Sequence, residues 1–280
     1  MIMKISNRLL AGLLTILVLQ TNIAFSQDTK EEAQQPPVIV VTTAHADFDY
    51  KEGSMKDWKA IEKEYFDKVT SKNEYLMNTN VLMHMFTEDN SEVKFIRVCK
   101  NWGDIEKAAE RDVELAKEAW PDKEKRSAFF KKQAKYYTNM HSDEIYQAIE
   151  GAKFMEEPET EESLVYYVQV SHLAFPEDSK PGEIQELYKE YSENVIHNNS
   201  HILAYYPYTH LYGADGREFV EVYVVKSFGD IENALDEMGD LAKAHWPDDE
   251  ARKEFFKKYG NYFTGWHADY VYSNIPELMK

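Results

Sequence analysis

Histidine is the residue type whose spacing in this sequence points most directly to chemistry, because imidazole exchanges a proton near neutral pH. Six of the nine histidines form three pairs with matching neighbours: His45 and His172, His84 and His210, and His141 and His267. On an extended strand, His210 shares a face with Tyr206, Tyr208 and Tyr212. We therefore take His84 and His210 as candidate catalytic bases. The structural alternative is a set of hydrogen-bonded His and Tyr side chains on a partly solvated sheet.

The second group of candidates comes from two strand patterns near 92–100 and 218–226. Aliphatic residues such as Ile96 and Val222 alternate there with Arg97, Glu221 and Tyr223. We expect the aliphatic face to pack under helices and the polar aromatic face to line a ligand pocket, where Arg97 and Glu221 pair. In the alternative, these two side chains reach solvent. The predicted ligand-binding residues are His45, His172, Arg97, Glu221, Tyr223, Tyr208 and Tyr212.

The third histidine pair lies in the repeated pattern T-x-x-H-x-D-x-x-Y, which contains His141 with Asp143 and His267 with Asp269. We interpret this pattern as the end of a helix, where His caps the last turn; the functional alternative is a His oriented by the neighbouring Asp. No H-x-x-x-H or H-E-x-x-H motif, glycine-rich phosphate loop or serine nucleophile elbow is present. The sequence therefore predicts no metal site and no cofactor.

The chain contains a tandem duplication of one unit. Residues 98–147 align without a gap with residues 224–273 and share 24 identities in 50 positions, among them the segments GDIE, LAK, WPD and FFKK. An upstream alignment pairs the strand patterns that contain His45 and His172. The acidic segment 151–163 reads as an exposed linker. We divide the chain into a signal peptide (1–26), a first repeat (27–150), this linker, and a second repeat (164–280).

Each unit has the same order of predicted elements. A β-branched strand is followed by a helix, two further strands joined by a turn, a long helical region and a short last strand. The helical region is interrupted at Trp120-Pro121 and Trp246-Pro247, where we expect each tryptophan to anchor the junction and each proline to occupy the first turn of a new helix. The order is β-α-β-β-α-β, typical of a ferredoxin-like unit.

A four-stranded sheet covered by helices on one face needs a second layer on the other. Two copies in one chain supply it by packing sheet to sheet, and in this respect the sequence resembles the dimeric α+β barrel superfamily in single-chain, tandem form. The expected fold class is α+β, with two ferredoxin-like repeats forming an intrachain barrel. The resemblance implies several functions, because the superfamily includes small monooxygenases, isomerases, haem-dependent peroxidases, chlorite-degrading enzymes and proteins without known activity. The haem members use a late axial His, which His267 matches only in position.

The first 26 residues have the three parts of a secretory signal: a basic start with Lys4 and Arg8, an apolar run over 9–19, and a polar exit of small residues. We expect cleavage near Ser26 and a periplasmic or secreted protein, without a membrane anchor and without a lipid-anchoring Cys after the apolar run. A net charge of −18 argues against nucleic acid as the partner. Cys99, the single cysteine, excludes an intrachain disulfide.

Three functions remain open from the sequence. The first is an exported protein that binds a small organic molecule between its two sheets. The second is a cofactor-independent monooxygenase or isomerase with a His/Tyr pocket, which requires side chains of both repeats to converge. The third is a non-catalytic structural or interaction module with a filled barrel. The oligomeric state does not follow from the sequence.

Overall fold

A computed structural model describes residues 35–155 and 162–280 of the chain. The predicted signal peptide and residues 156–161 of the acidic linker lie outside these residues. Before the gap, Lys153 forms a β-bridge with Tyr205, so the start of the predicted linker packs on the second repeat. Within the described part, no helix has the length and apolar character that crossing a membrane requires, and the thiol of Cys99 is buried.

Both repeats have the predicted order of elements, with the second helical region divided into two helices. The first repeat consists of β1 (Val38–Ala46), α1 (Met55–Lys68), β2 (Leu76–Phe86), β3 (Glu92–Cys99), α2 (Gly103–Ala119), α3 (Lys123–Ala134) and β4 (Tyr137–Ala148). The second consists of β5 (Val165–Leu173), α4 (Glu183–Tyr191), β6 (Ala204–Tyr212), β7 (Glu218–Val225), α5 (Gly229–His245), α6 (Asp249–Gly260) and β8 (Phe263–Asn274).

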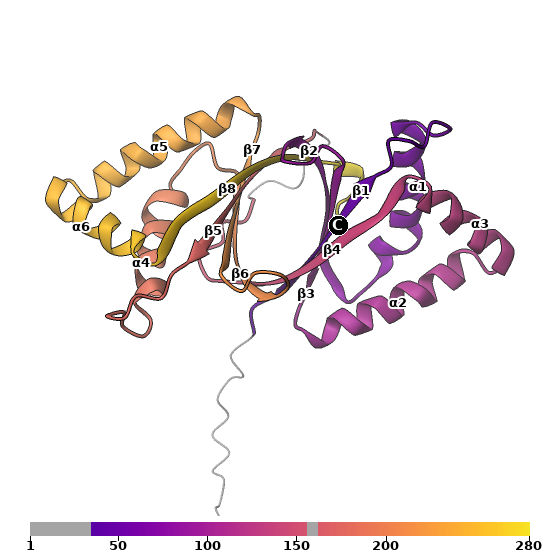
Figure 1. Ribbon diagram of the computed structural model, residues 1–280, viewed down its shortest axis with the longest axis horizontal. Helices are drawn as coiled ribbons and strands as arrows, with labels where there is room; N and C mark the ends of the chain where they lie inside the picture. The colour runs from indigo at the N-terminus through magenta and orange to yellow at the C-terminus, as the bar shows by residue number, and fades with distance from the viewer. Residues whose placement is uncertain (1–34, 156–161) are drawn as a thin grey trace, which may run out of the picture. The chain divides into compact units, whose positions relative to one another are not determined.

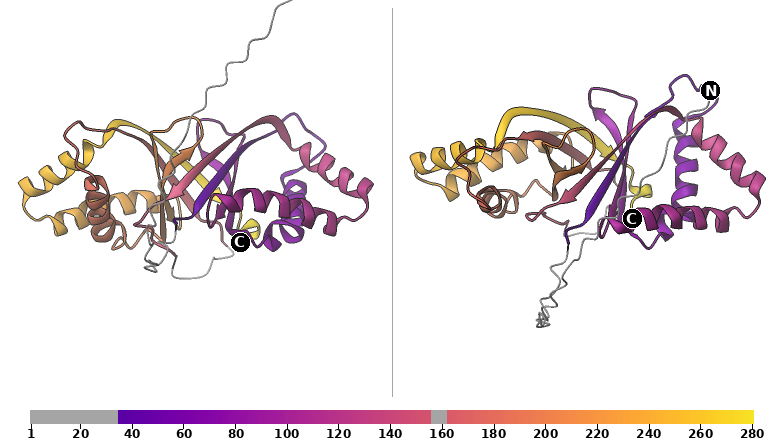
Figure 2. Two further views of the ribbon diagram at one scale, coloured as in Figure 1. Left: turned by 90° about the horizontal axis from the view of Figure 1, so that it is seen from below. Right: turned by 60° about the horizontal axis from the view of Figure 1, so that its bottom comes forward.

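The eight strands form one closed barrel in the order β1-β3-β2-β8-β5-β7-β6-β4. Each repeat contributes a four-stranded antiparallel sheet, and the edges of the two sheets join through β2 with β8 and β4 with β6. Helices α1 to α3 lie on one side of this barrel and α4 to α6 on the opposite side (Figures 1 and 2). The predicted fold class is confirmed, and joining the edges leaves no strand without a partner on either side.

The repeated WPD segment fixes the junction between two helices in each repeat. Asp122 and Asp248 cap α3 and α6, with their carboxylates accepting hydrogen bonds from backbone N–H groups of the first turn. Trp120 and Trp246 donate hydrogen bonds from Nε1 to Glu64 and Glu190, which confirms their predicted role as anchors. The prolines lie one residue before the caps rather than in the first helical turn, because the aspartate side chain is the group that can accept those hydrogen bonds.

The assignment of sheet faces from the sequence was wrong. The aliphatic residues of β3 and β7 point into the barrel, where a cluster with members from both repeats packs together: Ile39, Leu82, Tyr146, Leu164, Tyr166, Ala204, Val220, Val222, Val224 and Tyr272. The alternating residues, including Phe219 and Tyr223, lie under the helices of their own repeat. The physical reason is space: an eight-stranded barrel is only just wide enough to be filled by side chains, and here aliphatic side chains and several tyrosines fill it. The side chains of Arg97 and Glu221 lie between a sheet and its helices.

Candidate functional site

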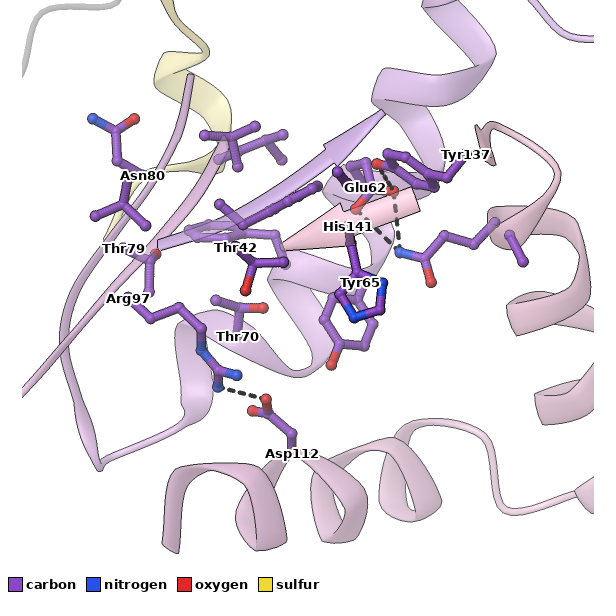
Figure 3. A pocket seen from close by; sticks show the side chains of 18 of the residues that line it. Thr42, Glu62, Tyr65, Thr70, Thr79, Asn80, Arg97, Asp112, Tyr137 and His141 are labelled. Atoms are coloured by element: carbon purple, nitrogen blue, oxygen red, sulfur yellow. Dashed lines mark hydrogen bonds and ion pairs between the residues drawn. The ribbon is translucent and has the colours of Figure 1, made fainter. Parts of the chain in front are cut away.

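A cavity of about 610 Å³ lies between the helix-facing side of the first sheet and helices α1, α2 and α3. Its walls combine apolar residues such as Val81, Phe95 and Phe130 with many polar side chains. The polar lining residues are Thr42, Glu62, Tyr65, Thr70, Thr79, Asn80, Arg97, Asp112, Gln133, Tyr137, Thr138 and His141, most of which are labelled in Figure 3. A cavity that combines apolar walls with polar groups is typical of small-molecule sites.

Glu62 is the buried carboxyl group of this cavity. It accepts hydrogen bonds from the Tyr137 hydroxyl (2.8 Å) and from Gln133 Nε2 (3.1 Å), and Tyr137 in turn accepts one from Trp58 Nε1 (2.7 Å). Burial raises the pKa of Glu62, and the two donors only partly offset this effect. The network therefore holds in place a carboxyl group that is more readily protonated than an exposed glutamate.

A second polar group of the cavity is the ion pair of Arg97 with Asp112, with Nη2 and Oδ2 2.5 Å apart. Asp112 also accepts a hydrogen bond from Asn73 Nδ2 (2.6 Å). The ion pair thus joins β3 to α2, and Asn73, in the loop before β2, fixes the carboxylate of Asp112. Tyr65 lies between this pair and the Glu62 network (Figure 3), and burial raises its pKa to about 12. The phenol is thus a neutral hydrogen-bond donor at physiological pH.

Thr79 leaves a hydrogen-bonding group of the cavity without a partner. Its side chain is 3% exposed, and Oγ1 makes no hydrogen bond with any residue in the described part of the chain. A buried hydroxyl without a partner costs free energy that a bound ligand or water recovers. Thr79 is therefore one point at which a ligand is expected to be recognised.

The same position in the second repeat is filled by side chains. An offset of 126 residues, supported by the equivalent bonds of Asn73 to Ala108 and Asn199 to Ala234, aligns the two sites. The lining residues Glu62, Thr79, Arg97, Asp112 and Gln133 correspond in this alignment to Tyr188, Tyr205, Tyr223, Met238 and Tyr259. All of these equivalents belong to, or pack against, one apolar cluster around Glu221. The first repeat thus has a cavity at this position, and the second repeat has packed side chains there.

Of the ligand-binding residues predicted from the sequence, Arg97 alone lines this cavity. Glu221 lies in the filled site of the second repeat, where it accepts hydrogen bonds from the hydroxyl groups of Tyr205 (2.5 Å) and Tyr223 (2.9 Å). The expected pairing of Arg97 with Glu221 is wrong, because each lies under the helices of its own repeat and has local partners there.

The remaining predicted residues lie elsewhere on the barrel. His45 contacts Ser91 and Asp89 through Nδ1 (3.0 and 3.1 Å), and His172 stacks on Trp266 with ring centroids 3.8 Å apart. Tyr208 packs against the interior cluster. Tyr212 is two-thirds exposed, because the strand pairing shifts register just before it.

The candidate bases His84 and His210 lie outside the cavity. His84 is paired with Tyr272 in the β2–β8 register, and His210 with Tyr146 in the β4–β6 register, so each lies beside a tyrosine of the other repeat. The Nδ1 atom of His84 contacts Thr87 Oγ1 at 2.8 Å. They mark two related positions on the barrel rather than one shared pocket.

His141 lies at the cavity, on a strand rather than at a helix end. Strand β4 begins at Tyr137, so His141 and Asp143 share one face of the strand, with Nε2 and Oδ2 3.8 Å apart. Thr42 also donates a hydrogen bond to Asp143 (2.5 Å). The helix-capping interpretation was wrong, because α3 ends at Ala134 and the last strand is longer than expected, so that it already includes His141.

Most of the lining residues were missed because they are spread over three helices and all four strands of the first repeat. A signal for them is nevertheless present in the sequence: aligned positions carry small or polar residues in one repeat and bulky ones in the other, as with Thr79 and Tyr205 or Asp112 and Met238. Such differences between two copies of one fold indicate where one copy keeps a hollow that the other has filled.

Comparison with known proteins supports the fold. No family profile matches the sequence, and no curated protein matches it significantly. Among solved structures, a proposed monooxygenase from Fusobacterium nucleatum has a TM-score of 0.56 at 12% identity, covering 86% of this chain and 93% of its own. A proposed monooxygenase from Lactobacillus acidophilus has a TM-score of 0.52 at 7% identity, covering 88% and 96%.

Chlorite dismutase from Candidatus Nitrospira defluvii, in complex with imidazole, has a TM-score of 0.51 at 10% identity, covering 87% of this chain and 93% of its own. At these identities the likeness concerns the fold alone. The protein therefore has the dimeric α+β barrel fold, built from two ferredoxin-like repeats in a single chain.

Proposed function

We propose that the protein binds a small organic molecule in the cavity of its first repeat. The carrying observation is the contrast between the repeats: the same position is hollow and polar in one and filled with tyrosines in the other. The proposed site lies between a sheet and its helices, whereas the sequence analysis expected it between the two sheets; the packed cluster inside the barrel supports this change.

The charges of the cavity favour a neutral ligand. The guanidinium of Arg97 is already balanced by Asp112, and the raised pKa of Glu62 makes its neutral form more accessible than that of an exposed glutamate. Apolar side chains such as Phe95 and Phe130 supply flat contact surface, while Thr79 and Tyr65 supply hydroxyl groups. A phenol or a quinone of one or two rings, with polar groups at its edge, matches this combination.

The test introduces into the first repeat the residue that fills the second. We expect Thr79→Tyr to fold, because Tyr205 occupies the aligned position, and to abolish the thermal stabilisation that phenols or quinones give to the unchanged protein. Thr264→Tyr places the same side chain at an exposed position and is expected to leave ligand stabilisation intact. Binding is measured by thermal shift over a phenol and quinone library and by calorimetry.

Two results would contradict this proposal. One is that no compound of the library stabilises the unchanged protein at millimolar concentration. The other is that Thr79→Tyr, shown by circular dichroism to be folded, binds a compound as tightly as Thr264→Tyr does.

A second candidate function is proton-transfer catalysis in the same cavity, favoured by the buried carboxyl of Glu62. When ionised, Glu62 would remove a proton from a bound phenol or carbon acid, leaving the electron pair on the ligand. The carboxyl group would then exchange this proton with solvent and deliver a proton, or in D₂O a deuteron, back to the ligand. It replaces His84 and His210 as the candidate base. We expect bound carbon acids to exchange hydrogen for deuterium in D₂O, and Glu62→Gln to slow this about 100-fold. Equal exchange rates in both proteins would exclude this role.

Export remains a proposal that rests on the N-terminal sequence pattern. Edman sequencing or mass spectrometry of protein recovered from the expressing bacterium is expected to find an N-terminus near Gln27 in the periplasm or medium. A retained Met1 in the cytoplasmic fraction would contradict it.

A further inference from the structure

Three side chains from three strands meet at one end of the barrel, away from the cavity. They are Glu144 of β4, His210 of β6 and Glu218 of β7, and each offers a ligand atom within 4.8 Å of those of the other two. Glu144 and His210 come from different repeats and are brought together by the β4–β6 pairing. All three are partly buried, so the cluster is not an arrangement of fully exposed surface charges.

His210 has an unsatisfied nitrogen at this position. Its Nδ1 is buried and forms no hydrogen bond within residues 35–155 and 162–280. The equivalent histidine of the first repeat, His84, uses its Nδ1 to contact Thr87. The position aligned with Thr87 is Gly213, which has no side chain to offer. With the ring proton on Nε2, this buried Nδ1 carries a lone pair that no hydrogen bond uses and that is available to a metal.

Gly213 also makes room for the first carboxylate. A Cβ at this position would lie 1.4 Å from Glu144 Oε2, and the backbone has φ +152°. The backbone N–H of Ala214 donates to the same oxygen (3.0 Å). The Tyr146 hydroxyl donates to Glu218 Oε2 (2.7 Å). One oxygen of each carboxylate is thus fixed by a donor, and each carboxylate keeps a second oxygen for ligation.

The related end of the other repeat lacks one of the three groups. The residues aligned with Glu144, His210 and Glu218 are Tyr270, His84 and Glu92. The supporting bond is kept there, with the Tyr272 hydroxyl donating to Glu92 (3.0 Å). The position around His210 differs from the one around His84 in two respects: it has the carboxylate of Glu144, and its histidine Nδ1 has no hydrogen-bond partner. The three groups are therefore complete at only one of the two related positions. The other position, around His84, serves as a control within the same protein.

We propose that Glu144, His210 and Glu218 bind a divalent transition metal ion such as Zn²⁺ or Mn²⁺. One imidazole nitrogen and two carboxylate oxygens suit these ions, whereas Mg²⁺ and Ca²⁺ prefer oxygen ligands alone. Three protein ligands leave a further coordination position for water or an anion. The sequence analysis predicted no metal, because the ligands are far apart along the chain and form no local motif.

Lys94 is the cation that competes with a metal at this end of the barrel. It donates a hydrogen bond to Thr43 (2.9 Å) and interacts electrostatically with Glu92, Glu218 and Glu144. Removing the positive charge of Lys94 leaves more of the negative charge of Glu144 and Glu218 available to attract a metal ion. Lys94→Gln is therefore expected to tighten metal binding several-fold.

The experiment titrates the EDTA-treated, dialysed protein with ZnCl₂, MnCl₂, MgCl₂ and CaCl₂ in a calorimeter. We expect one equivalent of Zn²⁺ or Mn²⁺ to bind, with Mg²⁺ and Ca²⁺ at least 10-fold weaker. His210→Gln is expected to weaken binding at least 100-fold, and His84→Gln to leave it unchanged. Co²⁺ absorption in the visible range gives a second readout, and Glu144→Gln replaces His210→Gln if the latter unfolds.

Four outcomes would overturn the proposal. These are no binding of Zn²⁺ or Mn²⁺ at millimolar concentration, equal weakening by His210→Gln and His84→Gln, unchanged affinity in Glu144→Gln, and unchanged or weaker affinity in Lys94→Gln. The first means that no site exists, and the others place the metal elsewhere.

Discussion

At the scale of single residues, each repeat contains a buried carboxyl group, but the surroundings of the two groups differ. Glu62 borders a cavity and is held by Tyr137 and Gln133, whereas Glu221 is enclosed by Tyr205 and Tyr223. Burial raises the pKa of both groups. The first carboxyl faces a space that a ligand can enter, and the second serves to satisfy the hydroxyl groups that fill the equivalent space.

Glu221→Gln tests this burial through the pH dependence of stability. Because the folded pKa lies above the ordinary value of 4.5, Glu221 stabilises the fold fully below that value and loses this contribution as pH rises through the folded pKa. The unfolding free energy of the unchanged protein minus that of Glu221→Gln should therefore fall as the pH rises above 4.5, by at most about 1.4 kcal/mol per pH unit.

Urea unfolding at each pH provides the measurement. Glu62→Gln is expected to show the same sign, since its pKa is raised for the same reason. A difference that stays constant, or that rises with pH, would refute the burial argument.

At the scale of elements, the short turn between β6 and β7 also shapes a site that involves the other repeat. Residues 213–217 form this turn, which joins the two strands as the sequence analysis expected. Gly213 is required there by its backbone conformation and by the carboxylate of Glu144. A local turn signal thus also sets the position of a side chain from the other repeat.

Gly213→Ala is expected to destabilise the protein by about 1–3 kcal/mol, because the added Cβ meets Glu144 in a strained backbone region. The matched control is Gly239→Ala in α5, where a Cβ meets nothing within 4 Å. That change should stabilise by about 0.5–1 kcal/mol, since alanine favours helix. Thermal melts compare the two; a Gly213→Ala protein as stable as the original would contradict the steric argument.

At the scale of the whole molecule, the closed barrel makes the two repeats one folding unit. The interior cluster takes residues from both repeats, and two pairs of edge strands join them. Neither repeat can lose its structure without exposing the apolar face of the other. We therefore expect a single unfolding transition for residues 35–280.

Ile39→Ala tests this coupling. The side chain is 1% exposed inside the barrel, and its truncation should cost about 2–5 kcal/mol. Far-ultraviolet circular dichroism and tryptophan fluorescence should report one shared, lowered midpoint, because tryptophans of both repeats respond together. Two separated transitions would show that the repeats unfold independently.

The sequence by itself determined the duplication, the order of elements and the sheet-to-sheet architecture. These follow from local periodicity and from 24 identities between two aligned segments, and periodicity depends only on residues near one another in the chain. The helix junctions at Trp120 and Trp246 were predictable for the same reason. The exact place of each proline was not, because Asp122 and Asp248 compete for the capping position.

Only the tertiary structure decided which face of each sheet points inward, and with it the site. Alternation shows that Ile96 and Arg97 lie on opposite faces, but which face is inside depends on the width of the closed barrel, a property of all eight strands together. The same closure brings Glu144 to His210, and the packing of α1 to α3 on the first sheet leaves the cavity beside Glu62. No local pattern connects the residues that meet at either place.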